Sequence, residues 1–480
     1  MCCGGWVIRI TLIATFFVIT AALLVYSQTV AFAWDEGFHL LAAQLIRSGR
    51  RPYADFLFAQ TPLNTYWNAL LIAMFGASWR PPHAVAAVET AGATVLTSLY
   101  VLRRFPVPEW RFILAIATAV LTGLNILVFQ FGTIAQAYGL CLLLVVAAFR
   151  LAVAAAERQS LALTVLAGLG AGAAAAASLL TAATGPVLLV WLTLRARSGR
   201  RIATAAGFAG GALAGLGPVL PFLLRWPRQL IFDVIGYHVF YRQVKWEGWL
   251  PHDALLLTDW LDSSQTFIML GLAIAGLIFL RRSDWDRSVR AEFYLCGWLT
   301  VATGLFVATA HPTFRQYFVF AVPFVAIMAV AGWYAIAHRW NRVWTSALVM
   351  AILAGGLGRN LYDESDNMTW ASFDEVVRDV NAVTPKGATL AADEQIYFLT
   401  GRTPPAGLEW TSGHKIEIPL ERARPLHVLP QSELDREVKQ GAFSTYETCY
   451  DGEVDRIGLK KIYAQEKETD DCYVFWDRRH

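Results

Sequence analysis

Long apolar stretches recur along the first three quarters of the chain, and its charged positions gather between them. A helix needs roughly 20 mainly apolar residues to cross the hydrocarbon core of a bilayer, and several stretches approach that length with almost no charge. The pattern therefore predicts eleven membrane-spanning helices. They lie near residues 10–30, 84–102, 111–130, 135–150, 161–180, 183–195, 202–224, 264–280, 291–310, 317–337 and 343–360.

One more apolar stretch, residues 63–75, is shorter than the others and fits an interfacial segment better than a span. Arginine-rich links decide its status, because Lys and Arg collect on the cytoplasmic side of a membrane. If residues 63–75 do not cross and the N-terminus is cytoplasmic, the arginine-rich links all fall inside; these are 103–104, 150–158, 195–201, 281–287 and 338–342. We therefore expect a cytoplasmic N-terminus and an outer C-terminus. Arg47, Arg50 and Arg51 then lie outside, within a folded amphipathic loop.

The first apolar segment has two interpretations. Ala31-Phe32-Ala33 resembles a signal-peptide cleavage site. The apolar run that begins at Trp6 is nevertheless longer than the usual core of about 7–15 residues in a signal peptide, which favours an uncleaved anchor. Both interpretations place Asp35 outside.

This topology divides the chain into a membrane domain, residues 1–360, and an outer soluble domain, residues 361–480. Two large outer loops, 34–83 and 225–263, belong to the membrane domain. In the tail, acids and bases interleave, and Pro and Gly separate short runs, which indicates a small α/β domain. Residues 372–383 have helical spacing, with Ser372 as the N-cap and Glu375 completing a capping box. Cys449 and Cys472 either form a disulfide, as an oxidising compartment permits, or remain two thiols.

The composition narrows the range of possible functions. Hydrophobic residues make up 56% of the chain and charged residues 16%, whereas soluble domains carry about 25% charged residues. The formal net charge of +3 is too small to indicate a nucleic-acid partner. No nucleotide-phosphate loop is found, because the glycines of residues 168–172 lie in an alanine-rich span, where small residues let helices pack closely. This argues against a nucleotide-sugar donor.

The first outer loop opens with two adjacent acids, Asp35 and Glu36. The residues that follow, up to Ser48, predict an interfacial helix that Gly49 ends. The two acids have a structural explanation. Asp35 is then the N-cap and Glu36 lies in the first turn, where the helix dipole favours negative charge. A functional explanation is also open: adjacent helical residues point about 100° apart, so the two acids cannot share one role. Asp35 and His39 are four residues apart, which places them on one face.

Residues 34–76 resemble the first outer loop of the GT-C superfamily of integral-membrane glycosyltransferases. They are most similar to the branch of the protein O-mannosyltransferases and the lipid A aminoarabinose transferase. Residues 311–330 are similar to the branch's R-Y-x-x-P-x-x-P helix. The matching positions of the loop are Asp35-Glu36, Gly49, Pro52-Tyr53, Asp55, Pro62, Tyr66-Trp67 and Phe75-Gly76.

The resemblance implies a mostly α GT-C fold in a bacterial inner or plasma membrane. It implies that a sugar carried on a polyprenyl phosphate is transferred, with inversion, to a hydroxyl or amine of a protein, lipid or glycan on the outer face. Asp35 is then the general base, and Glu36 orients the loop or the acceptor. One base suffices, since the leaving group is already a phosphate anion.

Further residues are candidates for substrate binding. His39 and Asp55 lie in the first loop, where Asp55 is alternatively a turn cap. Glu89 is an acid inside the second span, which is a functional hypothesis by default. Tyr237 and His238 occupy the second loop, where the aminoarabinose transferase has a metal-contacting histidine; a divalent metal at His238 and a simple interfacial aromatic cluster are both open, and no other cofactor is expected. His311 and Arg315 are candidates for the donor phosphate, with a snorkelling charge as the alternative for Arg315.

Some positions depart from the aminoarabinose transferase. Phe38 replaces an arginine, Thr61-Pro62 replaces Lys-Pro, and Thr184-Gly185 replaces Lys-Gly, while an acid often found before the fourth span is Gln136. Lysine contacts to the phosphate are therefore missing, and the resemblance does not imply that this chain has the same substrate as the aminoarabinose transferase.

The alternative function is that of a transporter or flippase, or of a polyprenyl-lipid-binding protein without transferase activity. Transporters usually contain internal repeats and carry their key charges at the middle of the membrane. This sequence has no clear repeat, and most of its candidate charges lie at the outer surface.

Overall fold

The computed structural model describes residues 3–29, 35–242, 249–340, 342–363 and 369–479. Trp34, the cleavage-like Ala31-Phe32-Ala33 and residues 243–248 of the second predicted loop lie outside the described residues. The chain forms two compact units, each built from segments distant in sequence. Unit 1 comprises Met1–Ser27, His83–Val219 and Gly248–Ser365, and unit 2 comprises Gln28–Pro82, Leu220–Glu247 and Asp366–His480.

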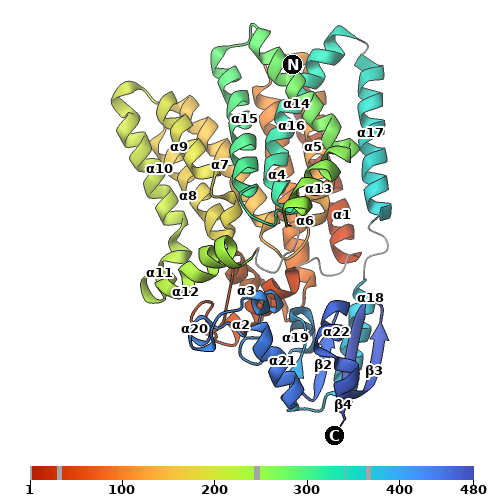
Figure 1. Ribbon diagram of the computed structural model, residues 1–480. Coiled ribbons are helices and arrows are strands. Elements are labelled where there is room, and N and C mark those ends of the chain that lie inside the picture. The colour runs from red at the N-terminus through yellow and green to blue at the C-terminus, as the bar shows by residue number, and fades with distance from the viewer. Residues whose placement is uncertain (1–2, 30–34, 243–248, 341, 364–368, 480) are drawn as a thin grey trace. The chain divides into compact units, whose positions relative to one another are not determined.

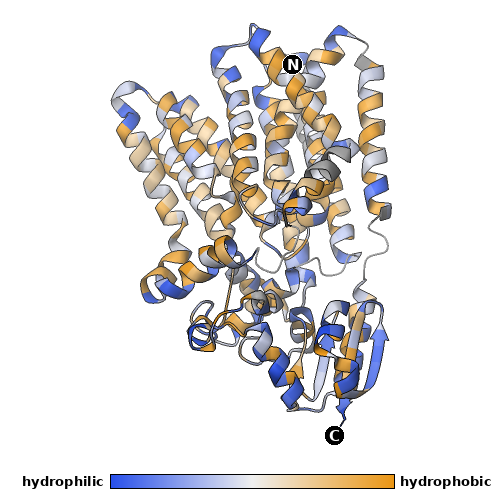
Figure 2. Ribbon diagram, in the orientation of Figure 1, coloured by the Kyte–Doolittle hydropathy of each residue, from blue (hydrophilic) through white to orange (hydrophobic). Residues whose placement is uncertain are grey.

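Unit 1 is helical, and apolar residues dominate its helices (Figures 1 and 2). Its elements are α1 (Cys3–Thr29), α4 (Arg80–Arg104), α5 (Pro108–Gly123), α6 (Ile126–Phe131), α7 (Tyr138–Arg158), α8 (Leu161–Ala177), η1 (Leu179–Thr181), α9 (Thr184–Arg195), η2 (Ser198–Arg200), α10 (Arg201–Gly215), η3 (Gly217–Val219), α13 (Trp249–Asp262), α14 (Ser264–Arg282), α15 (Arg287–Val307), η5 (Arg315–Ala321), α16 (Val322–Arg339) and α17 (Arg342–Asp363).

Helical segments cover most of each of the eleven predicted spans, and the span at 202–224 continues into α11 (Leu220–Arg225) of unit 2. Among the described residues, four continuous helices are long and apolar enough to cross a membrane by themselves: Arg80–Arg104, Tyr138–Arg158, Ser264–Arg282 and Arg315–Arg339. A fifth candidate is the pair Ser198–Gly215 and Gly217–Arg225, which bends by 47°. The chain is therefore an integral membrane protein, and the count of eleven stays a prediction.

Small residues bring α8 and α10 into close contact. A Cβ atom added at Gly168 would lie 2.1 Å from the carbonyl oxygen of Phe208, and one at Gly172 would lie 2.1 Å from that of Ala212. The glycines of residues 168–172 therefore serve helix packing, as the sequence predicts.

Unit 2 combines the first outer loop, residues 220–247 and the tail. Its elements are α2 (Glu36–Arg47), α3 (Leu63–Phe75), α11 (Leu220–Arg225), α12 (Pro227–Ile231), the π-helix η4 (Phe232–Tyr241), α18 (Trp370–Val383), β1 (Leu390–Ala391), α19 (Glu394–Thr400), η6 (Thr411–Lys415), α20 (Leu420–Ala423), η7 (Arg424–Leu426), α21 (Gln431–Gln440), β2 (Thr445–Thr448), α22 (Asp451–Ile457), α23 (Leu459–Ile462), β3 (Tyr463–Thr469) and β4 (Cys472–Arg478).

The strands of the tail form one mixed sheet in the order β1-β2-β4-β3. Strands β1 and β2 are parallel, and the other pairs are antiparallel, with Tyr446 opposite Phe475. The tail thus contains both helices and strands, while the division of the chain at residues 360 and 361 stays a prediction.

The predicted helix at 372–383 begins earlier than expected. It starts at Trp370, and Thr369 is its N-cap, accepting the Ser372 N–H at 3.4 Å. The assignment of Ser372 as N-cap was therefore wrong. Because Thr and Ser cap helices with the same hydroxyl chemistry, spacing alone did not separate the two positions.

Candidate active site

The predicted site residues divide between the two units. Unit 2 contains Asp35, Glu36, His39, Asp55, Tyr237 and His238, and unit 1 contains Glu89, His311 and Arg315.

The two acids at the start of α2 lie in opposite environments. Asp35 occupies the N-cap position and is exposed, but its carboxylate makes no capping hydrogen bond to the helix. Glu36 is fully buried. The structure thus removes side-chain capping as the explanation of Asp35, and it separates the two acids as helical geometry requires.

His39 is buried one helical turn beyond Asp35. Its ring packs against those of Phe38 and Phe58, with centroids 5.5 and 6.2 Å away. Burial lowers the pKa of His39 to about 4, and the charge of Glu36 acts in the opposite direction. Among the described residues, its Nδ1 atom has no hydrogen-bond partner. His39 is therefore a neutral imidazole at physiological pH.

The tail approaches the start of α2 through α19. A Cβ atom at Gly37 would lie 2.8 Å from the backbone nitrogen of Gln395. Glu394 and Tyr450 interact electrostatically with Asp35. Burial raises the pKa of Glu394, and the charge of Asp35 adds to the effect. No local sequence pattern points to Glu394 or Tyr450, because local patterns do not report contacts between such distant segments.

An aromatic residue of the tail joins the two outer loops. The Trp410 ring lies 5.1 Å from that of Phe38 and 4.7 Å from that of Tyr237. Next to it, the buried carboxylate of Glu409 accepts a hydrogen bond from Arg50. Tyr237 is thus part of a buried aromatic cluster that spans both loops and the tail.

Asp55 is paired with Arg51 in a turn. Its carboxylate accepts the Arg51 backbone N–H at 2.7 Å and two guanidinium N–H groups at 3.0 Å. The Arg51 hydrogen bond is also the main reason that the pKa of Asp55 is lowered. These contacts favour the turn-cap alternative for Asp55, and its substrate-binding role stays a prediction.

Two side chains of η4, in the second outer loop, form hydrogen bonds with consecutive residues of the first outer loop. The Nε2–H of His238 donates to the carbonyl oxygen of Ala59 at 2.7 Å, and the Phe58 N–H donates to Asp233 Oδ2 at 2.9 Å. Burial, with the charge of Arg242, lowers the pKa of His238 to about 4. Asp233, which the sequence analysis missed, is buried, and burial raises its pKa well above the ordinary value.

These contacts do not fit a metal at His238. Three potential ligand atoms from His, Cys, Asp or Glu come within reach of one another in one place in the described part of the chain, at Glu447, Cys449 and Cys472. Both cysteines there are consumed by a disulfide. We therefore derive no catalytic step from a metal.

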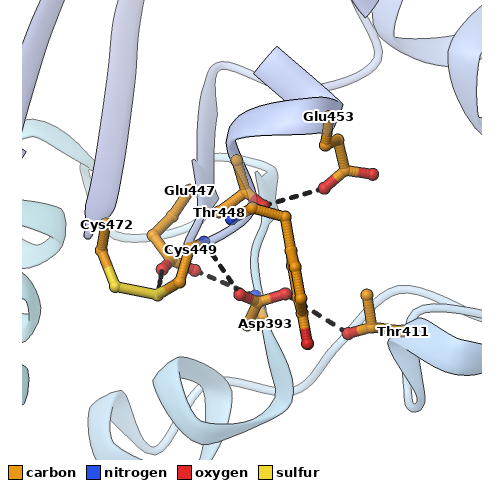
Figure 3. Close-up of a disulfide and its surroundings, with 8 residues drawn as sticks. Asp393, Thr411, Glu447, Thr448, Cys449, Glu453 and Cys472 are labelled. Atoms are coloured by element: carbon orange, nitrogen blue, oxygen red, sulfur yellow. Dashed lines mark hydrogen bonds between the residues drawn. A yellow bond between two sulfur atoms is a disulfide. The ribbon is translucent and has the colours of Figure 1, made fainter. Parts of the chain in front are cut away.

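The Cys449–Cys472 disulfide lies next to the segment that precedes α19 (Figure 3). The Cys449 N–H donates to Asp393 Oδ2 at 3.1 Å, and the Asp393 N–H donates to Glu447 Oε2 at 2.9 Å. Burial raises the pKa values of Asp393 and Glu447; the charge of Glu394 adds to the effect on Asp393, and the charge of Asp393 adds to the effect on Glu447. Since Glu394 follows Asp393 directly, the disulfide and these carboxyl groups position the neighbour of Asp35.

In unit 1, the candidate His311 is held by an acid that the sequence analysis missed. Asp253 Oδ2 accepts the His311 Nδ1–H at 2.8 Å, and Asp253 Oδ1 accepts the Thr313 N–H at 2.7 Å. Arg315 begins η5 two residues later. Glu89 is half-buried within α4, where its charge faces Cys141 of α7. The roles of these candidates stay predictions.

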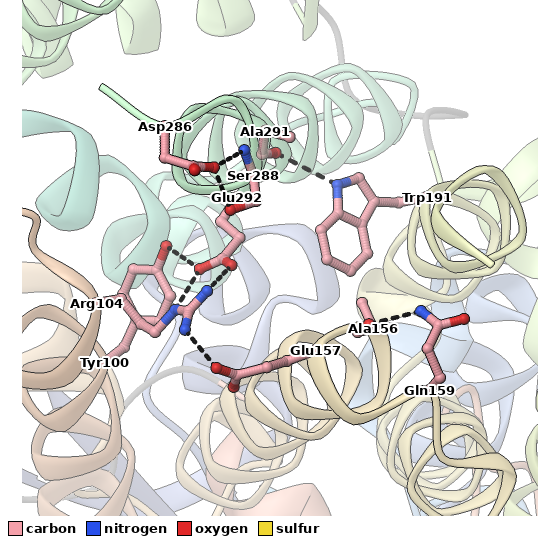
Figure 4. Close-up of polar contacts among 10 residues, drawn as sticks. All are labelled: Tyr100, Arg104, Ala156, Glu157, Gln159, Trp191, Asp286, Ser288, Ala291 and Glu292. Atoms are coloured by element: carbon pink, nitrogen blue, oxygen red, sulfur yellow. Dashed lines mark hydrogen bonds and ion pairs between the residues drawn. The ribbon is translucent and has the colours of Figure 1, made fainter. Parts of the chain in front are cut away.

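A second polar network of unit 1 joins three helices (Figure 4). Arg104 of α4 bonds through Nε to the buried Glu292 of α15 at 2.9 Å and through Nη1 to Glu157 of α7 at 2.9 Å. The Tyr100 hydroxyl donates to the same Glu292 carboxylate at 3.3 Å. All its charges are paired, so this network is structural.

No protein-family model matches the chain, and no curated protein matches it in sequence. Solved structures do match. ArnT from Cupriavidus metallidurans bound to undecaprenyl phosphate aligns with a TM-score of 0.65 at 16% identity over 98% of both chains. Its apo state gives 0.66 at 15% identity, covering 99% of this chain and 98% of that one.

An oligosaccharyltransferase from Archaeoglobus fulgidus in the apo form gives a TM-score of 0.53 at 10% identity, covering 91% of this chain and 69% of that one. ArnT is the lipid A aminoarabinose transferase, and both proteins are GT-C glycosyltransferases. The chain therefore has the GT-C fold that its first outer loop predicted.

Proposed function

We propose that the chain transfers a sugar from a polyprenyl-phosphate donor to an acceptor on the outer face of the membrane, with inversion and with Asp35 as general base. The observation that carries the proposal is the exposed side chain of Asp35, which makes no capping hydrogen bond to α2, in a fold shared with a protein solved with undecaprenyl phosphate. A transporter or lipid-binding role gives Asp35 no comparable task.

The reaction is a single displacement at the anomeric carbon. The acceptor oxygen or nitrogen forms a bond to that carbon while Asp35 takes the acceptor proton. The bond from carbon to the phosphate oxygen breaks, and its electron pair leaves with the polyprenyl phosphate. One displacement inverts the configuration, and a single base suffices because the leaving group needs no proton.

The other residues bind and orient. Glu36, buried beneath Asp35, orients the start of α2. His311 and Arg315 bind the donor phosphate, since charge-assisted hydrogen bonds to phosphate are strong. Asp253 fixes the ring of His311 by accepting its Nδ1–H at 2.8 Å. His39, Asp55, Glu89 and Tyr237 are kept as proposed substrate contacts.

The test compares the wild-type protein with Asp35→Asn, using a panel of radiolabelled polyprenyl-phosphate sugars and a membrane extract as acceptor. Loss of a general base is expected to slow transfer by roughly 10²–10⁴-fold, with donor binding unchanged. Asp374→Asn, an exposed acid of α18, is the matched control and is expected to transfer at the wild-type rate.

Equal transfer by wild type and Asp35→Asn would remove Asp35 from catalysis. Donor binding without transfer from any donor would favour the lipid-binding alternative, and movement of the donor across a vesicle membrane would favour the flippase.

A further inference from the structure

The turn at Phe58–Gln60 is held almost entirely by hydrogen bonds from outside its own backbone. Asp233 accepts the Phe58 N–H, and His238 donates to the Ala59 carbonyl. The Tyr53 hydroxyl donates to the Gln60 carbonyl at 2.6 Å, and the Gln60 N–H closes the turn on the Phe58 carbonyl at 2.9 Å. Side chains thus provide the partners that a strand or helix would otherwise supply.

The helix type explains how two residues of η4 reach one turn. Asp233 and His238 are five apart, which in an α-helix would point them about 140° from each other, following from 3.6 residues per turn. In a π-helix the backbone bonds join residues i and i+5, so the two side chains come onto one side. π-helical segments are rare and frequently lie at functional sites.

The protonation of both groups suits these contacts. His238 is neutral with its proton on Nε2, because the atom donates to a carbonyl. Burial favours the neutral carboxyl of Asp233, whose Oδ2 accepts the amide proton, while Oδ1 has no partner among the described residues. The bonds therefore need neither a charge nor a metal.

Buried polar groups follow directly after the turn. The hydroxyls of Thr61 and Thr65 are buried and have no partner among the described residues. Buried polar atoms are nearly always satisfied, by protein, water or ligand. The segment that η4 holds thus leads into a polar site that a bound molecule or water completes.

We propose that Asp233 and His238 are positioning residues: together they clamp the Phe58–Gln60 turn and set the start of α3 for the substrate. The proposal rests on the proposed transferase function. It assigns His238 a backbone-binding role in place of metal or substrate contact, and it adds Asp233, which lies outside the sequence-predicted site.

The experiment uses the full chain in lipid nanodiscs and pairs each disruptive variant with a conservative one. His238→Leu and Asp233→Leu remove the bonds. His238→Gln keeps an N–H in reach of the Ala59 carbonyl, and Asp233→Asn keeps an acceptor oxygen for the Phe58 N–H. Val239→Ala, which changes an exposed side chain of η4, is the control. The readouts are hydrogen exchange of peptides covering residues 56–62, donor binding, and kcat and KM for transfer.

Both leucine variants are expected to speed exchange in residues 56–62 and to lower kcat/KM by about tenfold, the effect of one lost buried hydrogen bond. Both conservative variants are expected to restore protection and activity. If His238→Gln is as inactive as His238→Leu while the turn stays protected, His238 acts on substrate directly and the proposal is overturned. Unchanged protection in the leucine variants would overturn it as well.

If the proposed transferase function is wrong, the experiment gives a different set of results. In that case the wild type transfers no sugar from any donor, and the positioning role for transfer fails with it. Hydrogen exchange then still reports whether η4 holds the turn.

Discussion

Single side chains in unit 2 show how burial selects protonation states. His39 and His238 are neutral because charged imidazoles are poorly solvated in the interior, and Asp233, Asp393 and Glu447 have raised pKa values for the same reason. The exposed Asp35 stands beside these groups without sharing their burial. This difference in exposure supports the proposal that Asp35 is the general base.

The pKa of His39 predicts how stability depends on pH. The unfolded chain takes up the His39 proton below pH 6.5, whereas the folded protein does so only near pH 4. Between these values the unfolded state binds more protons, so the free energy of unfolding falls as the pH is lowered. This contribution is complete above pH 6.5 and lost towards pH 4.

The measurement compares thermal unfolding of wild type and His39→Phe from pH 7 to pH 4. The buried carboxyl groups with raised pKa values act in the opposite direction, and the comparison cancels them. The wild type is expected to lose stability relative to His39→Phe as the pH falls. A difference that stays constant with pH would contradict the assignment.

Among the secondary-structure elements, the contact of α2 with α19 depends on a missing side chain. At Gly37 a Cβ atom would meet the backbone of Gln395 at 2.8 Å, and backbone cannot move aside as a flexible side chain does. Gly37→Ala is therefore expected to destabilise unit 2 by about 1–3 kcal/mol. It should also speed hydrogen exchange in α19.

A matched glycine provides the control. Gly452 is helical in α22, and an added Cβ meets nothing within 4 Å. Gly452→Ala should stabilise the protein by about 0.5–1 kcal/mol. Equal effects of the two substitutions would refute the close approach of α2 and α19.

The helices α4 and α15 are joined by an ion pair between the partly buried Arg104 and the buried Glu292. Arg104→Met leaves the carboxylate of Glu292 buried without its cation, which costs about 3–5 kcal/mol. The double variant Arg104→Met with Glu292→Gln should recover most of this loss, because no buried charge remains. Glu157→Ala, whose carboxylate is 54% exposed, should cost under about 1 kcal/mol. The measurement is thermal unfolding of the wild type and these three variants. A double variant as unstable as Arg104→Met would contradict the role assigned to the Arg104–Glu292 pair.

At the scale of the whole molecule, both units are assembled from three separate stretches of chain. Unit 2 unites the first predicted outer loop and the beginning of the second, up to Glu247, with the tail, so residues that are hundreds of positions apart become neighbours. A substitution in the tail should therefore affect the first outer loop directly, as the contacts of Trp410 and Glu409 require.

The arginine pattern predicts the orientation of the chain in the membrane. A cysteine at Thr403 of the tail is expected to react with a membrane-impermeant thiol reagent in intact cells. A cysteine at Ser198, within the arginine-rich link 195–201, should react only after permeabilisation. Both positions are exposed. Labelling of the Ser198→Cys variant in intact cells would contradict the predicted orientation.

The sequence alone determined the elements whose cause is local. Apolar stretches became the helices of unit 1, and residues 63–75 became the short helix α3. The helix after Asp35 ends before Gly49, whose φ of +90° suits glycine. The acid pair and the order of the loop motifs were enough to indicate the GT-C fold. Hydrophobic periodicity and helix-breaking residues act within a few residues of the chain, so the sequence displays them directly.

Only the tertiary structure decided which residues surround these elements. It buried Glu36 while leaving Asp35 exposed, brought Glu394 and Trp410 to α2, and turned His238 towards the backbone of Ala59. It also joined Cys449 to Cys472, a choice that the sequence left open. Such contacts follow from the packing of distant segments, and burial then sets the charge of each group. No local pattern contains that information.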